Sequence, residues 1–198
     1  LTQAPHVSNG YITFGCLNNA VKITETCISL WSQILGQHPT SKLLLKDKLF
    51  DSPELVEDTS QRFKELGVDR RRLIFLGGTH HTEHLKAHEL IDIALDPVPY
   101  SGGLCTLEAL YMGVPVVALA GQLLCHRHSV THLAQVNELE LVGTSGQDYV
   151  QIASSLASNP HRIDTYRQTL REKLMASPLC DHVSFARDFL EGLKKAAI

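Results

Sequence analysis

The chain has 198 residues and a net charge of −3, with 43% hydrophobic and 20% charged residues. These values are typical of a globular protein that buries a substantial core. Because lysine and arginine are scattered, we expect no nucleic-acid partner. No apolar run is long enough to span a membrane and no signal peptide is recognisable, so we expect no membrane partner either.

The five cysteines are widely spaced, and no pair of them forms a CxxC motif. An odd number without that spacing argues against a disulfide framework and against a zinc site. The pattern is typical of reduced thiols and favours a cytoplasmic location. The chain begins with Leu1 rather than methionine, and from this we expect a fragment of a longer protein.

Short apolar runs alternate with amphipathic segments along the first half of the chain. After an extended lead-in over residues 1–10, a strand is expected at Tyr11–Cys16. A helix is expected over Ile23–Leu35, with Thr24 as its N-cap. In chain order there follow a strand at Lys42–Lys46, a helix at Pro53–Leu66, a strand at Arg72–Leu76, a helix at Thr82–Leu90 and a strand at Ile91–Asp96.

The second half continues the alternation and ends in helices. The expected elements are a helix at Leu104–Met112, strands at Pro115–Ala120 and near Glu140–Val142 with a helix at Ser129–Val136 between them, and helices at Gln147–Ala157, Arg162–Ala176 and Val183–Lys195. Strands separated by helices predict right-handed crossovers and a mostly parallel sheet. The sequence therefore predicts one doubly wound α/β domain over residues 1–198, with a tail of C-terminal helices over residues 160–198.

Two glycines, Gly102 and Gly103, lie between the strand Ile91–Asp96 and the helix that begins at Leu104. Ligands of parallel sheets bind beyond the carboxyl ends of the strands, and the first N–H groups of a helix have no partner inside it. Glycines without Cβ atoms let a phosphate approach those N–H groups. The turn predicts a pyrophosphate site, although it is also typical of a tight strand–helix connection.

Glu108 lies about one turn into the same helix, where its side chain leans back toward the N-terminus. A carboxylate there can accept hydrogen bonds from the ribose of a nucleotide held on the turn; the alternative is a solvated glutamate. In a dinucleotide-binding domain the glycine fingerprint GxGxxG follows the first strand. Here the first strand is followed by Leu17-Asn18-Asn19, and the glycine turn comes after the fourth strand. The order fits the nucleotide-binding half of a glycosyltransferase better than a dehydrogenase.

The sequence resembles a known family in four segments. These are FGCLNNAVKIT (Phe14–Thr24), PTSKLLLKDKLF (Pro39–Phe50), DPVPYSGGLCTLEALYMGVPVVALAG (Asp96–Gly121) and SPLCDHVSFA (Ser177–Ala186). Their order and intervals resemble the C-terminal catalytic lobe of the protein O-GlcNAc transferase family, including its SPINDLY-like branch, from about Tyr11 to Leu193. The resemblance implies a GT-B enzyme whose Rossmann-like second lobe binds the nucleotide-sugar donor, and which transfers the sugar to Ser or Thr of proteins without a metal.

The resemblance also implies a set of site residues. Lys22 falls at the lysine that contacts the phosphates and is the expected catalytic group, and Asn19 falls near the diphosphate. His84 matches the family histidine near the nucleotide. The loop around the diphosphate is matched by Gly102, Gly103 and Thr106, and the acidic residue on the ribose by Glu108.

The chain departs from the family pattern at two places. Leu104 and Cys105 replace hydroxyl-bearing residues of the loop, so that the backbone donors remain while side-chain hydroxyls are lost. This departure implies a weaker donor affinity or a different donor. Ala87 stands where some members place an arginine against the base, and Arg127 and Ser129 fall in the next family segment without an assigned chemistry.

Positive charge is needed where a diphosphate leaves. A helix N-terminus and Lys22 supply it, and no DxD run is present, so we expect no metal. A solvated lysine is the alternative for Lys22, but the helix dipole disfavours a cation at a helix start. His84 and His88 stand one helical turn apart, as metal ligands can, yet no third ligand has matching spacing.

The sequence thus predicts the donor-binding lobe of an inverting, metal-independent protein O-glycosyltransferase without a cofactor. UDP-GlcNAc is the first choice of donor and GDP-fucose the second. The protein acceptor is expected to contact a first lobe and a repeat array outside this chain, so we expect the chain alone to bind nucleotide without turnover. The alternatives are a nucleotide-sensing or interaction domain that has lost catalysis, marked by Leu104 and Cys105, and an unrelated Rossmann-like enzyme.

Overall fold

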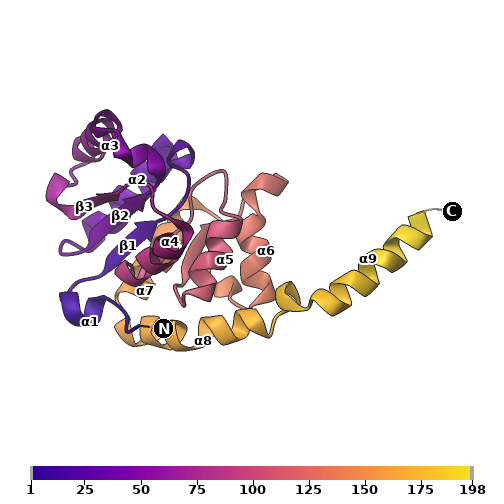
Figure 1. Cartoon of the computed structure of the whole chain (residues 1–198). Coiled ribbons are helices and arrows are strands. Elements are labelled where there is room, and N and C mark those ends of the chain that lie inside the picture. Colours follow the sequence, from indigo (N-terminus) through magenta and orange to yellow (C-terminus); the bar gives the residue numbers. More distant parts are fainter. Residues whose placement is uncertain (1, 197–198) are drawn as a thin grey trace.

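A parallel sheet of six strands, in the order β3-β2-β1-β4-β5-β6, forms the centre of the protein (Figure 1). The computed structural model describes residues 2–196. The strands are β1 (Thr13–Cys16), β2 (Lys42–Lys46), β3 (Leu73–Leu76), β4 (Ile93–Leu95), β5 (Val116–Leu119) and β6 (Val142–Gly143). All five strand pairings are parallel. The predicted doubly wound α/β fold is confirmed.

Helices connect the strands and flank the sheet. They are α1 (His6–Asn9), α2 (Glu25–Gln37), α3 (Pro53–Glu65), α4 (His81–Ala87), α5 (Leu104–Tyr111), α6 (His128–Gln135), α7 (Gly146–Ala157), α8 (Pro160–Met175) and α9 (His182–Ala196). Local signals set their starts: the Thr24 hydroxyl accepts from the N–H of Cys27, as predicted, and Ser52 and Asn159 cap helices that begin with a proline.

The lead-in is not extended throughout, which corrects the sequence-based prediction. Residues 6–9 form the short helix α1, and Leu1 lies outside the described residues. Ala4 is buried, and the His6 N–H donates to Asp92 Oδ1 at 3.0 Å. A buried carboxylate at the start of β4 therefore satisfies an N–H group at the start of this helix, an interaction without a periodic sequence signal.

A buried hydrogen-bonded chain ties the helices to the sheet at its carboxyl edge. Trp31 Nε1 on α2 donates to the hydroxyl of Tyr149 on α7 at 3.0 Å, and that hydroxyl donates to the carbonyl oxygen of Asp96, also at 3.0 Å. Both aromatic side chains are fully buried. The end of β4, where the glycine turn begins, is thereby fixed by the core behind it.

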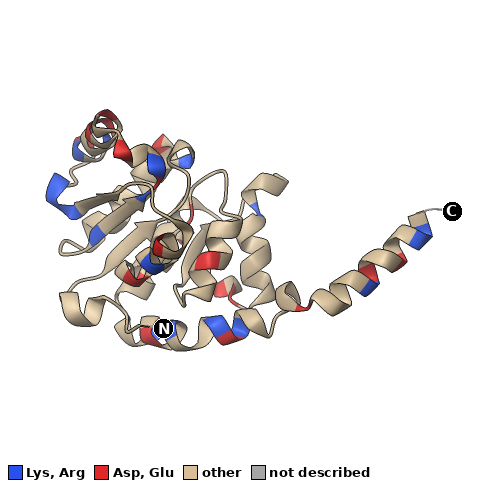
Figure 2. Cartoon of the chain, viewed as in Figure 1, with Lys and Arg blue, Asp and Glu red and all other residues tan. Residues whose placement is uncertain are grey.

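The last helix, α9, runs away from the rest of the protein (Figure 1). None of its residues His182–Ala196 is buried, and residues 197–198 of the predicted tail lie outside the described part. Acidic and basic residues are interspersed over the elements (Figure 2). Within residues 2–196, no helix combines the length and the apolar character that crossing a membrane requires.

Candidate nucleotide site at the carboxyl edge of the sheet

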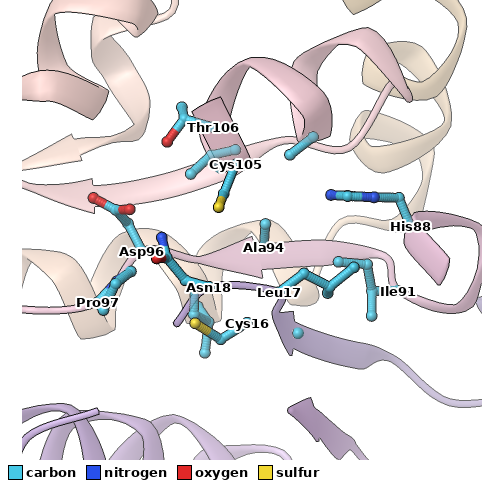
Figure 3. A pocket seen from close by; sticks show the side chains of 14 residues that line it. Cys16, Leu17, Asn18, His88, Ile91, Ala94, Asp96, Pro97, Cys105 and Thr106 are labelled. Atoms are coloured by element: carbon cyan, nitrogen blue, oxygen red, sulfur yellow. The ribbon is translucent and has the colours of Figure 1, made fainter. Parts of the chain in front are cut away.

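The strand order reverses between β1 and β4, and a small cavity lies there beneath the start of α5. Figure 3 shows Asn18, Asp96, Cys105 and Thr106 gathered at one end of this cavity and His88 at the other. Its volume of about 20 Å³ is enough for one water molecule. The cavity is too small for a nucleotide, so a ligand of that size would have to lie outside it, on the edge that these residues support.

Some N–H groups of the glycine turn are hydrogen-bonded within the protein, and others are left open, that is, without a backbone acceptor among the described residues. Gly102 N–H donates to Asp96 Oδ1 at 2.7 Å, so this group is occupied by the protein itself. Among residues 2–196, the N–H groups of Gly103, Leu104 and Cys105 donate to no backbone carbonyl group. The open donors are thus the first N–H groups of α5, where the helix dipole also favours an anion.

The two glycines have different reasons to be glycine. A Cβ atom on Gly102 would lie 2.5 Å from Thr106 Oγ1 and 2.8 Å from Asp96 Oδ1, so the close packing behind the turn excludes any side chain there. A Cβ atom on Gly103 would have its nearest neighbour, His128 Nδ1, at 3.9 Å. The φ angle of Gly103 is −107°, outside the left-handed region that favours glycine.

Hydroxyl groups support the turn from behind. Thr106 is buried and its Oγ1 lies 2.7 Å from Ser129 Oγ, which in turn donates to the carbonyl oxygen of Gly102 at 2.9 Å. The side chain of Thr106 is thus engaged inside the protein rather than held out toward a ligand. Ser129, to which the sequence assigned no chemistry, is the partner that engages it.

Lys22 lies beside the same turn. Its Nζ donates to the carbonyl oxygen of Ser101 at 3.0 Å and stands 4.3 Å from the centre of the Tyr100 ring. Asn19 is exposed on the rim, and its Oδ1 accepts from the N–H of Val21. The structure therefore brings Lys22 to the open N–H groups, while the oxygen of Asn19 caps its own short helix.

A single peptide bond of the turn is held at both ends. The carbonyl oxygen of Ser101 accepts from Lys22, and the N–H of Gly102 on the same peptide bond donates to Asp96. We call this arrangement a peptide clamp: a lysine on the carbonyl oxygen and an aspartate on the N–H of one peptide bond. It fixes the peptide plane that precedes the open N–H groups.

Asp96 is a site residue that the sequence interpretation missed as such. It is 4% exposed, and its Oδ2 has no hydrogen-bond partner among the described residues. Burial raises the pKa of this carboxyl group to about 7, against the N–H of Gly102 and the charge of Lys22, which lower it. An aspartate at the end of a strand directly before Pro97 and the glycine turn was the available signal.

Glu108 faces two histidines across the gap between α5 and α4. His81 Nδ1 lies 3.7 Å from Glu108 Oε1, and His84 Nε2 lies 3.6 Å from Glu108 Oε2. His84 is the main cause that holds the pKa of the Glu108 carboxyl group below its usual value. The structure brings together Glu108 and His84, which were predicted separately, and His81, which was not predicted, joins them.

The other residues singled out from the sequence have less polar surroundings. His88 packs edge-on against His84, and burial lowers the pKa of His88 to about 4, so its imidazole is neutral. Leu104 is 67% exposed at the start of α5, and Ala87 is buried. Burial also raises the pKa of the Cys105 thiol, which makes Cys105 a poor nucleophile at neutral pH.

The model of the family described as glycosyl transferase family 41 matches residues 3–189. The chain is 39% identical over 193 residues to a barley (Hordeum vulgare) protein named "Probable UDP-N-acetylglucosamine--peptide N-acetylglucosaminyltransferase SPINDLY". It is also 39% identical, over 191 residues, to the protein of the same name from tomato (Solanum lycopersicum). These alignments cover 97% and 93% of the chain.

A solved structure has the same fold over nearly the whole chain. The K341M mutant of the O-GlcNAc transferase from Thermobaculum terrenum superposes with a TM-score of 0.89 at 31% identity, covering 94% of this chain and 36% of that one. The chain spans about a fifth of the length of the barley and tomato relatives, 20% in each case.

Proposed function

Because the chain belongs to glycosyl transferase family 41, we propose that it is the donor-binding lobe of a protein O-glycosyltransferase. In this proposal the lobe holds a nucleotide-sugar whose sugar is transferred to a Ser or Thr hydroxyl of an acceptor protein. The acceptor contacts then belong to parts of the enzyme outside this chain, in accord with the small share of its relatives that the chain spans.

The observation that carries the proposal is the pairing of open backbone donors with one ammonium group. The N–H groups of Gly103, Leu104 and Cys105 lie at the start of α5, and the ammonium group of Lys22 contacts the same turn at Ser101. When the sugar is transferred, the bond between its anomeric carbon and the β-phosphate oxygen breaks and negative charge develops on the diphosphate. Fixed donors at that position stabilise this charge without a metal.

The nucleoside has a place next to the diphosphate. Glu108 lies one helical turn behind the open N–H groups, with His81 and His84 opposite it. The ionised Glu108 accepts hydrogen bonds from ribose hydroxyls, and His84 lies against the nucleoside. Asn19 and Thr106 are the remaining members of the proposed site, as a rim group and as the support of the turn.

UDP-GlcNAc is the first donor to test, since the barley and tomato relatives carry UDP-N-acetylglucosamine in their names. GDP-fucose is the second. The backbone donors and Lys22 recognise the diphosphate that both share, so the choice between them rests with the nucleoside and sugar contacts. No cofactor enters the proposal.

Thermal unfolding with added nucleotides tests the proposal. A ligand that binds only the folded state raises the melting temperature, and UDP or GDP at 100 times its Kd should raise it by roughly 5–10 °C. Calorimetric titration with UDP, GDP and their sugar conjugates then ranks the donors. If neither nucleotide at millimolar concentration shifts the melting temperature, the chain is not a donor-binding lobe.

A further inference from the structure

A second peptide clamp holds the turn that leads into α4. Lys46, the last residue of β2, is 2% exposed, and its Nζ donates to the carbonyl oxygen of Gly77 at 2.7 Å. The N–H of Gly78, on the same peptide bond, donates to Asp51 Oδ2 at 3.2 Å. One lysine and one aspartate thus hold both ends of the Gly77–Gly78 peptide bond.

The arrangement repeats the clamp at the start of α5. There Lys22 and Asp96 hold the Ser101–Gly102 peptide bond, and here Lys46 and Asp51 hold the Gly77–Gly78 bond. Each clamped bond follows a strand at the carboxyl edge and precedes a helix of the proposed site. The lysines come from the connection after β1 and from the end of β2, so the two clamps use different parts of the chain.

Burying the ammonium group of Lys46 costs free energy of folding. Its ammonium group is buried, and among residues 2–196 no carboxylate lies within ion-pair distance of it. Burying a charge without an opposite charge is unfavourable, and one carbonyl oxygen offsets only part of that cost. An apolar side chain at the end of β2 would be buried at a lower free-energy cost. The presence of the ammonium group there therefore indicates a role other than core packing.

The turn itself is fitted to the clamp. A Cβ atom on Gly77 would lie 1.7 Å from Asp51 Oδ1, and one on Gly78 would lie 3.1 Å from Lys48 Cβ. The backbone therefore packs directly against the connection between β2 and α3. A side chain at Gly77 would push the turn away from Asp51 and from Lys46 together.

The turn determines where two histidines of the site lie. Helix α4 begins at His81, directly after the Gly77–His80 segment, and it carries His81 and His84 to within 3.7 Å and 3.6 Å of Glu108. Since α4 has only seven residues, His81–Ala87, its position depends on the segments at its two ends. A shift of the Gly77–Gly78 peptide bond is therefore carried to both histidines.

We propose that Lys46 and Asp51 are positioning residues that fix α4 against Glu108 for the nucleoside part of a nucleoside diphosphate, an inference that rests on the proposed function. Each clamp then serves a different part of the ligand. The Lys22–Asp96 clamp orders the turn that binds the diphosphate, and the Lys46–Asp51 clamp orders the helix that binds the nucleoside.

The division predicts different effects on two probes, UDP or GDP and inorganic pyrophosphate. Lys46→Met keeps the apolar stem and removes the donor, and it should weaken nucleoside diphosphate binding about tenfold while pyrophosphate binding stays unchanged. Lys46→Arg, which retains a cationic donor, should recover most of the affinity. Lys64→Met is the matched control, because Lys64 is an exposed lysine on α3, and it should bind both probes as the wild type does.

Calorimetry decides the ligand part of the inference. Unchanged nucleotide affinity in Lys46→Met overturns it, and so does an equal loss for pyrophosphate, since that would indicate a general disturbance of the edge. Asp51→Asn keeps an oxygen acceptor for the Gly78 N–H and should bind nucleotide more tightly than Asp51→Ala. Asp51 is exposed, so both variants are expected to fold.

Hydrogen exchange tests the clamp without any ligand. In Lys46→Met the hydrogen-bonded amides of Gly78 and His84 should exchange about tenfold faster, while those of Gly102 and Thr106 keep their protection. Unchanged exchange at Gly78 and His84 overturns the inference. If the wild type binds neither UDP nor GDP, the proposed function fails and the nucleoside role falls with it; faster exchange at Gly78 and His84 then still upholds the clamp as the element that positions α4.

Discussion

At the scale of single residues, Lys22 joins the fold to the proposed chemistry. Its ammonium group has one carbonyl acceptor, Ser101, among residues 2–196, which leaves further donors for an anion on the same turn. Lys22→Ala should weaken binding of UDP or GDP by ~1.5–3 kcal/mol, the value of a hydrogen bond to a charged group.

Lys86→Ala is the control for Lys22→Ala, because Lys86 is an exposed lysine on α4 that pairs with Glu83. Calorimetry should show wild-type affinity for this variant. The melting temperature of Lys22→Ala in the absence of ligand should stay close to that of the wild type. Equal nucleotide affinity in wild type and Lys22→Ala would reduce Lys22 to a structural contact with Ser101.

Asp96 gives the protein a specific dependence of stability on pH. Its pKa is about 7 in the folded protein against an ordinary value of 3.8, so the folded state keeps a proton that the unfolded state releases. The resulting stabilisation is complete below about pH 4 and is lost as the pH rises through about 7. Asp96→Asn, which retains an acceptor for the Gly102 N–H, removes this dependence.

Melting temperatures measured from about pH 5 to pH 8 check the prediction for Asp96. The wild type should lose more stability over that range than Asp96→Asn does. Asp58→Asn changes an exposed carboxylate on α3 and should follow the wild-type curve. Parallel curves for wild type and Asp96→Asn would show that Asp96 does not titrate in this range.

The candidate site residues that the sequence could indicate are those whose side chains match a family pattern or a helical spacing. Glu108, His84 and Lys22 were found in this way, and the structure places all three around the start of α5 and α4. Asp96 and Lys46 were missed, because their partners are backbone groups of Gly102 and Gly77. A side chain that serves a backbone group far along the chain leaves no spacing in the sequence.

At the scale of elements, the two glycines of the turn before α5 have different roles. Gly102 allows close packing behind the turn, and Gly103 leaves the N–H groups at the start of α5 accessible. Gly102→Ala places a Cβ atom 2.5 Å from Thr106 Oγ1 and 2.8 Å from Asp96 Oδ1, so it should lower the free energy of unfolding by roughly 1–3 kcal/mol. Gly103→Ala has space for its Cβ atom inside the protein, but it places alanine at the N-cap of α5, and should lower the free energy of unfolding by about 0.5 kcal/mol.

Gly102→Ala should have the larger effect on stability, whereas Gly103→Ala should have the larger effect on nucleotide affinity. Gly103→Ala places a methyl group beside the open N–H groups and should weaken nucleotide binding while the fold is kept. Denaturant unfolding and calorimetry of both variants check the pair of effects. If Gly103→Ala binds UDP or GDP as tightly as the wild type, the diphosphate does not approach the turn at this residue.

The positions of the helices and strands were largely predictable, because the strands are short apolar runs and several helices, namely α2, α3, α7 and α8, begin after a capping residue. The strand β2 has the predicted bounds Lys42–Lys46, and α2 begins after the predicted cap Thr24. The short helix α1 was not predictable, since its four residues make no periodic pattern and its start is held by Asp92, the residue directly before β4. Contacts between distant segments thus decided the elements that local patterns did not.

At the scale of the whole molecule, the core and the site belong to one unit. The buried chain from Trp31 through Tyr149 to the carbonyl oxygen of Asp96 connects α2 and α7 to the end of β4, where the first clamp begins. The strand order, with its reversal between β1 and β4, places both clamped turns on the same edge of the sheet. Stability of this unit therefore depends on the lobe through α8, before the chain reaches α9.

The helix α9 should be dispensable for that unit. Apolar residues of α9 remain 50–69% exposed, namely Val183, Phe185, Phe189, Leu190 and Leu193. Because burial of apolar surface is the main source of folding free energy, a helix that buries none of its residues adds little to it. A chain ending at residue 181 should melt within about 2 °C of the full chain and bind UDP or GDP with the same affinity.

A matched truncation makes the prediction for α9 sharper. Ending the chain at residue 159 removes α8 as well, with the buried side chains of Ile163, Tyr166, Arg167, Leu170 and Leu174, and it should unfold the protein or lower its melting temperature strongly. Circular dichroism melts of the three chains check the order. A large loss of stability on removing α9 alone would mean that this helix packs on the lobe in solution, and that its exposed apolar side chains are covered there.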